Sequence, residues 1–175
     1  AQYALARHLA LKHHAEVVFD CSYFSDTPPG DTPRRYELGH LAVHGRMATR
    51  EEIGRLSGQG GSLWSRLLRK TGLQNPSVFF EPPGRFCPEV LDLPDNSYLV
   101  GYWLSEGYFA EIADLLREEL RVAAPLSDRN LELSRKILEV EAVAVHVRRG
   151  DYVSSPKTTA FHGILGQDYY EQGIM

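Results

Sequence analysis

Two adjacent arginines, Arg148 and Arg149, are the clearest candidates for functional residues in this sequence. They directly follow the apolar run 142–147, Ala-Val-Ala-Val-His-Val, which predicts a strand. The planar guanidinium fork of arginine binds a phosphate bidentately and stays charged at any working pH. Neighbouring side chains of an extended chain point to opposite sides, so we expect the two arginines to have different tasks. The pair predicts a phosphate-binding site.

Residues beside the arginines could support such a site. His146 could donate a hydrogen bond to a ligand oxygen, and Gly150 permits a tight turn and close approach of a ligand. Asp151 could orient one arginine through an ion pair. In the alternative interpretation, Arg149 and Asp151 form a turn ion pair and nothing binds. An Arg-Gly-Asp adhesion motif at 149–151 is disfavoured, because a tripeptide recurs by chance and this one abuts a buried strand.

The elements around this motif predict an α/β fold. The run 142–147 is apolar on both alternating faces, which is typical of a strand inside a parallel sheet covered by helices. Such sheets bind ligands at the carboxyl ends of their strands, where the arginines lie. Helical spacing or capping signals predict helices over 2–14, from Thr49, after Ser105 and over 128–138, and strand-type runs cover 17–20, 36–43, 77–80 and 98–103.

The composition excludes several classes of function. The 175 residues are 43% apolar and 24% charged, as in an ordinary globular protein. A formal net charge of −4 argues against a nucleic-acid-binding protein, which usually carries a basic excess. The two cysteines stand outside any Cys-x-x-Cys pattern, so a structural zinc site is not expected. No apolar run reaches the length of a membrane span.

Four segments, in chain order, carry a family resemblance. Residues 145–153, Val-His-Val-Arg-Arg-Gly-Asp-Tyr-Val, resemble the H-x-R-R-G-D-Y signature of the α-1,2-fucosyltransferase family. Residues 2–6 are similar to the end of its amino-terminal G-N-Q-x-F-Q-Y-A motif, and residues 101–109 resemble its G-Y-W-Q-S-E-x-Y-F stretch. Residues 162–170 resemble the H-G-x-L…Y-Y segment of bacterial members. The departures are Ala1 for an aromatic residue, Leu104 for glutamine and Gly173 for alanine.

The resemblance implies a GT-B glycosyltransferase, in which two Rossmann-like domains, each a parallel sheet covered by helices, face a cleft. Residues 1–138 would form the N-terminal, acceptor-side domain. Residues 139–175 would form the first strand and helix of the donor-binding domain, which would be incomplete. On this interpretation the chain is truncated at both ends.

The implied reaction transfers L-fucose from GDP-fucose to the 2-hydroxyl of a galactoside, with inversion. No Asp-x-Asp motif occurs, so a metal clamp of that type has no obvious ligands. We therefore expect transfer without a metal and with no cofactor besides the donor substrate. Arg148 would meet the charge that develops on the leaving phosphate. Arg149 would hold the loop or brace the two domains, and Asp151 would position an arginine or act as the base. Predicted donor contacts are His146, Arg148, Arg149, Tyr152, His162 and Tyr169. For the last three the alternative is aromatic packing or helix capping, and His162 could equally be a solvent-facing loop residue.

The expected partners are GDP-fucose and a galactose-containing glycan, in a bacterial enzyme of the cytoplasm or the membrane periphery. The truncated chain alone could be inactive as an enzyme. Two other functions stay open: a non-catalytic module, formed by the truncated fragment, that binds a carbohydrate or nucleotide, and a transferase that uses another sugar nucleotide. Tyr98, Tyr102, Trp103 and Tyr108 could present a sugar-stacking surface or belong to the core. Asp20, Glu37 and His40 receive no role.

Overall fold

The computed structural model describes residues 1–25, 33–58, 77–147, 149–154, 156, 159–160 and 163–174. The chain divides into two compact units, one within residues 1–124 and the other from Pro125 onward, and each is described by itself. The domains predicted over 1–138 and 139–175 stay a prediction.

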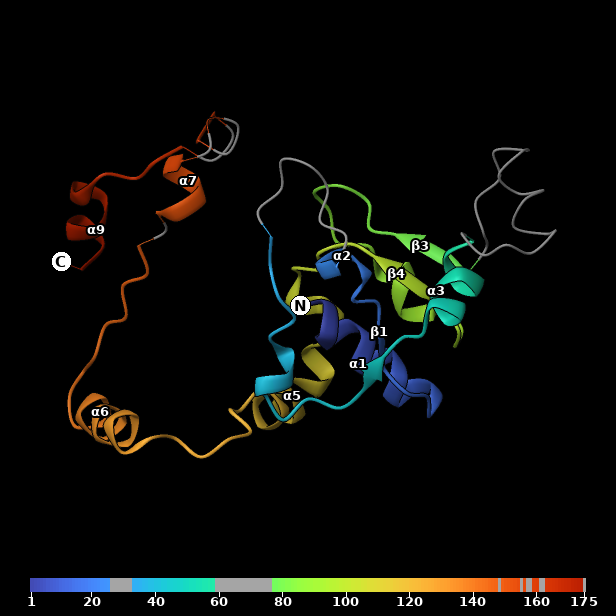
Figure 1. Cartoon of the computed structure of the whole chain (residues 1–175), viewed down its shortest axis with the longest axis horizontal. Helices are drawn as coiled ribbons and strands as arrows, with labels where there is room; N and C mark the ends of the chain where they lie inside the picture. Colours follow the sequence, from blue (N-terminus) through green and yellow to red (C-terminus); the bar gives the residue numbers. More distant parts are fainter. Residues whose placement is uncertain are drawn as a thin grey trace. The chain divides into compact units, whose positions relative to one another are not determined.

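The first unit alternates helices with short strands (Figure 1). Its α-helices and strands are α1 (Gln2–His13), β1 (Val18–Phe19), α2 (Ser22–Ser25), β2 (Arg46–Met47), α3 (Arg50–Ser57), β3 (Val78–Phe80), β4 (Tyr98–Val100) and α5 (Ala113–Glu119). Its 3-10 helices are η1 (Leu38–His40), η2 (Pro88–Asp92), η3 (Glu106–Tyr108) and η4 (Ala110–Ile112). The second unit contains α6 (Asp128–Leu138), α7 (Gly150–Ser154) and α9 (Gln167–Ile174).

Local sequence signals explain where the best-defined helices begin and end. α3 begins at Thr49 with a complete capping box: the Thr49 hydroxyl accepts from the Glu52 N–H, and the Glu52 carboxylate accepts from the Thr49 N–H. α1 ends at His14, whose φ of 53° is left-handed and stops the helix. The helices predicted over 2–14, from Thr49 and over 128–138 are therefore confirmed.

The strands pair in parallel, as predicted for an α/β fold. β1 pairs with β2, and β3 pairs with β4, each pair forming a two-stranded sheet. The described residues contain no larger sheet. Mixed helices and small parallel sheets confirm the α/β class, whereas the Rossmann-like, GT-B arrangement stays a prediction.

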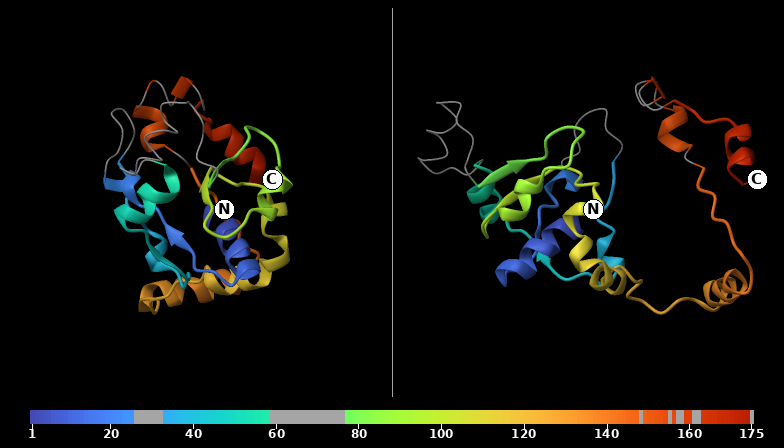
Figure 2. Two further views of the ribbon diagram at one scale, coloured as in Figure 1. Left: turned by 90° about the vertical axis from the view of Figure 1, so that its right-hand side faces the viewer. Right: turned by 180° about the vertical axis from the view of Figure 1, so that it is seen from behind.

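Helix α1 joins the two buried clusters of the first unit. One of its faces packs with Val17 and with Leu116 of α5, and the views in Figures 1 and 2 place α1 beside α5. Leu5 and Leu9 lie in the second cluster, which also contains Val90, Trp103 and Tyr108. Trp103 is 1% exposed and Tyr108 is fully buried, so these two motif aromatics belong to the core.

Two predictions for the first unit are wrong in detail. The strand predicted over 36–43 is instead the 3-10 helix η1, closed by hydrogen bonds from His40 N–H to Glu37 O and from Leu41 N–H to Leu38 O. The single helix predicted after Ser105 is divided into η3, η4 and α5. The Ser105 side chain does cap its start, by accepting from the Gly107 N–H at 3.3 Å.

The strand predicted over 142–147 is also wrong for the described structure. Residues 141–147 form no strand there, and Val143, Val145 and Val147 are 68%, 46% and 47% exposed. A strand needs a neighbour to take up its backbone hydrogen bonds, and a two-sided apolar strand also needs helices on both faces. No described strand of the second unit offers that pairing. The described part of the arginine motif therefore does not follow a sheet strand.

Candidate functional site

A hollow of about 1350 Å³ opens in the first unit. Residues of both strand pairs line it, among them Phe19 of β1, Arg46 of β2 and Tyr98 of β4. α1 and α2 supply further walls. The volume exceeds that of a typical small-ligand pocket, which is about 300–1000 Å³, so the hollow could hold a ligand larger than one ring.

Asp20 lies in this hollow directly after β1, at a carboxyl strand end. Its Oδ1 accepts a hydrogen bond from the Ser22 N–H at 2.8 Å, and its Oδ2 accepts one from the hydroxyl of Tyr98. The second bond links β1 to β4 of the other sheet, 78 residues away in sequence. The half-buried Asp20 therefore joins the two strand pairs.

Electrostatics keep this carboxylate ionised. Burial works to raise the pKa of Asp20, but the hydrogen bonds from Tyr98 and Ser22 outweigh it, and the pKa is lowered from its ordinary value. Burial raises the pKa of the Tyr98 hydroxyl, and the hydrogen bond to Asp20 raises it further. At neutral pH Asp20 is a hydrogen-bond acceptor and Tyr98 remains a donor.

Four aromatic side chains beside Asp20 form what we call the aromatic wall: Phe19, Tyr23, Phe24 and Tyr36. Ring centroids lie 5.8 Å apart for Phe19 and Tyr36, 6.3 Å for Phe24 and Tyr36, and 6.0 Å for Tyr23 and Phe24. Tyr23 and Phe24 are 43% and 38% exposed. Unlike Trp103, this wall keeps much of its surface open.

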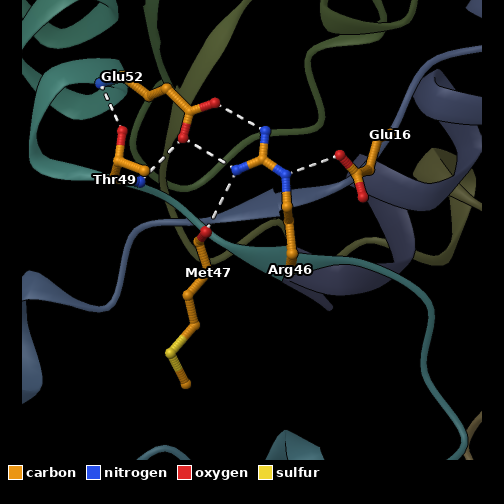
Figure 3. Close-up of polar contacts among 5 residues, drawn as sticks. All are labelled: Glu16, Arg46, Met47, Thr49 and Glu52. Carbon is orange, nitrogen blue, oxygen red and sulfur yellow. Dashed lines mark hydrogen bonds and ion pairs between the residues drawn. The ribbon is translucent and has the colours of Figure 1, made fainter.

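Arg46 is held by its own neighbours (Figure 3). Its Nε donates to Glu16 at 2.8 Å, and its Nη2 and Nη1 donate to Glu52 at 2.7 and 2.9 Å. Nη1 also reaches the Met47 carbonyl at 3.3 Å. The hydrogen bonds from Arg46, followed by the Thr49 N–H, lower the pKa of Glu52 to about 2. The guanidinium of Arg46 is thus paired with the carboxylates of Glu16 and Glu52.

The described lining of the hollow is acidic. Its five carboxylates outnumber its two arginines: Glu16, Asp20, Glu37, Glu52 and Asp95 against Arg46 and Arg55. Such a wall repels an anion such as a diphosphate and offers hydrogen-bond acceptors to the hydroxyl groups of a ligand. The hollow is therefore suited to a neutral, hydroxyl-rich ligand.

Two of the segments that carry the family resemblance meet at the hollow. The Gln2 side chain donates from Nε2 to the Gly101 carbonyl at 2.7 Å, and both residues line the hollow. Glu81 Oε2 accepts from the N–H groups of Tyr102 and Trp103 at 2.6 and 2.9 Å. The left-handed backbone of Trp103, with φ 56°, is supported by these bonds. Tyr102 is 76% exposed.

A buried ionic network underlies the same region. Glu119 of α5 is 4% exposed and accepts hydrogen bonds from Arg7 and from the Tyr3 hydroxyl, both on α1. The His44 N–H donates to the Tyr3 hydroxyl at 3.1 Å. The network fixes α1, and with it Gln2, relative to α5.

The structure describes the predicted donor-site residues only in part. His146 and Arg149 are exposed, Tyr152 is half-buried, and Tyr169 is 61% exposed and packs edge-on against Tyr170. Arg148, His162 and the Asp151 side chain lie outside the described residues, although the Asp151 backbone belongs to α7.

Backbone contacts order the described part of the motif. α7 begins at Gly150, whose φ is 37°, and the Tyr152 N–H donates to the Arg149 carbonyl at 2.8 Å. The Thr159 hydroxyl donates to the Tyr152 carbonyl at 2.6 Å. Gly150 thus makes the predicted turn, while the catalytic and donor-binding roles stay predictions.

Two features of the described residues concern metals and membranes. Among the described residues, no three His, Cys, Asp or Glu side chains gather in a metal-binding arrangement, which leaves the metal-independent reaction a prediction. Within the same ranges, no helix has both the length and the apolar composition needed to cross a membrane.

Comparison with known proteins gives three matches. A family model described as "Glycosyl transferase family 11" matches residues 85–175. The "O-antigen biosynthesis glycosyltransferase WbnK" of Escherichia coli is 28% identical over 191 residues, which cover 99% of this chain and 62% of that protein. An Escherichia coli "Alpha-1,2-colitosyltransferase" is 40% identical over 78 residues, which cover 43% of this chain and 26% of that protein.

The chain spans about three-fifths of the length of the first relative, 62%, and about a quarter of the second, 26%. No solved structure matches the chain significantly.

Proposed function

The chain belongs to glycosyl transferase family 11, the fucosyltransferase family that its motifs resemble, and on that premise we propose that it transfers L-fucose from GDP-fucose to the 2-hydroxyl of a galactoside. The observation that carries the proposal is the segment His146–Tyr152, His-Val-Arg-Arg-Gly-Asp-Tyr, inside the matched region. Two adjacent guanidinium groups suit a nucleoside diphosphate.

The proposed reaction is an inverting displacement without a metal. The acceptor 2-hydroxyl attacks C1 of fucose on the face opposite the diphosphate, and the bond from C1 to the phosphate oxygen breaks through an oxocarbenium-like transition state. GDP leaves with the electron pair. Arg148 stabilises the charge that develops on its β-phosphate. The hydroxyl proton goes to a base, for which Asp151 is the candidate.

The other residues of the motif would hold the donor. Arg149 keeps the loop in place, and His146, Tyr152, His162 and Tyr169 contact the nucleotide sugar. The hollow of the first unit receives the acceptor, because its carboxylates disfavour a diphosphate and suit hydroxyl groups. We expect a bacterial enzyme of the cytoplasm or the membrane periphery.

The donor sugar has one specific competitor. The name of the second relative assigns it colitose transfer, and that relative is 40% identical over 78 residues. A nucleotide-activated colitose is therefore the second candidate donor. The non-catalytic binding module predicts binding of a nucleotide or glycan without any transfer.

A transfer assay separates these cases. Purified protein is incubated with a fluorescent β-galactoside and either GDP-fucose or another sugar nucleotide, and the product is resolved chromatographically. The proposal predicts a fucosylated product from GDP-fucose. If product forms only from another sugar nucleotide, that nucleotide replaces GDP-fucose as the proposed donor. Binding without product would favour the non-catalytic module.

The variant Arg148→Lys tests the catalytic assignment. Lysine keeps the charge but cannot grip a phosphate bidentately, so we expect kcat to fall by about 100-fold, as for loss of one charge-stabilising donor. Arg135→Lys, on the exposed face of α6, is the matched control and should turn over like the parent protein. Parental turnover in folded Arg148→Lys would refute the role.

A further inference from the structure

The aromatic wall is more exposed than the core aromatics, and it lines the hollow, unlike the exposed Phe80, Phe86 and Tyr102. Trp103 and Tyr108 are fully or almost fully buried, whereas Tyr23 and Phe24 keep 43% and 38% of their surface exposed. Large aromatic rings that line a hollow and stay open to solvent offer their faces to a ligand.

Asp20 supplies the polar counterpart beside the wall. It lies between Phe19 and the helix α2 in sequence, and among the described residues its carboxylate accepts hydrogen bonds from Ser22 and Tyr98. An ionised carboxylate has about four acceptor sites, so Asp20 can also accept from a ligand hydroxyl. Hydrogen bonds to an ionised acceptor are roughly twice as strong as neutral ones.

We infer that Asp20 and the aromatic wall form the subsite that holds the terminal sugar of the acceptor glycan. A pyranose has an apolar face of C–H groups and an edge of adjacent hydroxyls, which match an aromatic face and a carboxylate. In a galactoside the C–H groups of C3, C4 and C5 lie on one face, which suits stacking on a ring. This inference rests on the proposed function for the identity of the sugar.

Asp20 acts here as a specificity residue rather than as the catalytic base. Tyr98 and Ser22 stabilise its charged form, which makes it a weak proton acceptor and a strong hydrogen-bond acceptor. The acidic lining around it excludes the diphosphate of the donor from the same place. The occupant is therefore a neutral glycan.

Galactoside binding without a donor tests the inference directly. Titration of the whole chain with methyl β-galactoside and with lactose is followed by ligand-observed NMR, which detects weak binding and needs no turnover. Asp20→Asn should weaken binding about tenfold or more, because a charge-assisted acceptor is lost. Phe24→Leu should weaken binding about fivefold, because it removes the ring and keeps apolar volume.

Two control variants match these changes. Phe80→Leu removes an aromatic ring that is 52% exposed on β3 and absent from the lining of the hollow, and Asp114→Asn removes a fully exposed carboxylate of α5. Both should bind the galactoside like the parent protein. Asp20 also links two strands, so Asp20→Asn could fail to fold. In that case Phe24→Leu alone still tests the subsite.

The outcomes separate this inference from the proposed function. Loss of galactoside binding in Asp20→Asn and Phe24→Leu, with both controls unchanged, supports the subsite even if GDP-fucose proves to be the wrong donor. Transfer from GDP-fucose with unchanged galactoside affinity in folded Phe24→Leu overturns the subsite and leaves the transferase proposal standing. Failure of the parent protein to bind any galactoside at millimolar concentration also overturns it.

Discussion

Replacing Glu119 with glutamine should measurably destabilise the first unit, because this buried carboxylate joins α5 to α1. Glu119 is 4% exposed, and its Oε1 accepts from Nη2 and Nε of Arg7 at 2.9 and 3.0 Å. Its Oε2 accepts from the Tyr3 hydroxyl, and His44 Nε2 lies 3.8 Å from Oε1. Glutamine keeps the shape and one acceptor oxygen but removes the charge.

The expected loss of unfolding free energy depends on how exposed the partner, Arg7, is. Breaking a buried ion pair by removing one charge typically costs about 3–5 kcal/mol, because the other charge stays buried. The Arg7 side chain is 19% exposed, so water can partly solvate the guanidinium left behind, and the glutamine oxygen retains some hydrogen bonding. We therefore expect Glu119→Gln to lower the free energy of unfolding by about 2 kcal/mol at pH 7.

The same group predicts a pH dependence. Burial works to raise the pKa of Glu119, but the hydrogen bonds from Arg7 and Tyr3 prevail and lower it. A carboxylate whose folded pKa is depressed stabilises the fold above its unfolded pKa of about 4.3. That contribution is lost as the pH falls through the lower, folded pKa. The stability difference between parent and Glu119→Gln should thus shrink below about pH 4.

Urea unfolding followed by far-UV circular dichroism at pH 7 and at pH 3 measures both effects. Glu118→Gln is the matched control, since Glu118 is 61% exposed and pairs with Arg121 three residues away. Its loss should change the free energy of unfolding by less than about 0.5 kcal/mol. If Glu119→Gln and Glu118→Gln have the same urea midpoint at pH 7 within experimental error, the network does not stabilise the fold.

Two further substitutions test local features of the first unit. Thr49→Ala removes one half of the capping box of α3 and should lower the free energy of unfolding by about 1 kcal/mol in urea unfolding, whereas Thr49→Ser should recover most of it. Gly101→Ala would bring a Cβ against the Cβ of Glu81 and to within 2.8 Å of Trp103 Cε2, and we expect it to cost about 1–3 kcal/mol by the same measurement. An alanine at position 101 that leaves stability unchanged would contradict the close packing.

The sequence predicted best those elements whose signals are local. The capping box at Thr49 is complete within four residues, so it can be recognised without knowledge of the fold. The spacing of Leu5 and Leu9 likewise predicted α1, and both are buried. The sequence does not reveal η1, because a three-residue 3-10 helix leaves no periodic pattern. Within the described part of the chain, Leu41 makes an isolated antiparallel bridge with Val122 and belongs to no strand.

The candidate acceptor site could not be predicted, because it depends on contacts distant in sequence. Asp20 and Tyr98 are 78 residues apart, and no spacing rule relates them. A signal did exist in the sequence: an acidic residue ends an apolar strand, and Tyr23 and Phe24 follow at once. By itself that pattern does not distinguish a ligand site from a strand end with packing aromatics, and only the fold brings Tyr36 beside them.

The arginine motif shows how a sequence pattern can separate from the structure that it predicts. Small and β-branched apolar residues on both faces give 142–147 a strand propensity. A strand forms only where another strand pairs with its backbone hydrogen-bonding groups. The charge argument for Arg148 does not depend on that pairing, since a guanidinium stabilises a leaving phosphate wherever it can reach it. What the sheet would add is rigidity, which fixes the fork and lowers the cost of ordering it on binding. Arg148→Lys therefore tests the chemistry of the motif on its own, independently of whether a strand holds it in place.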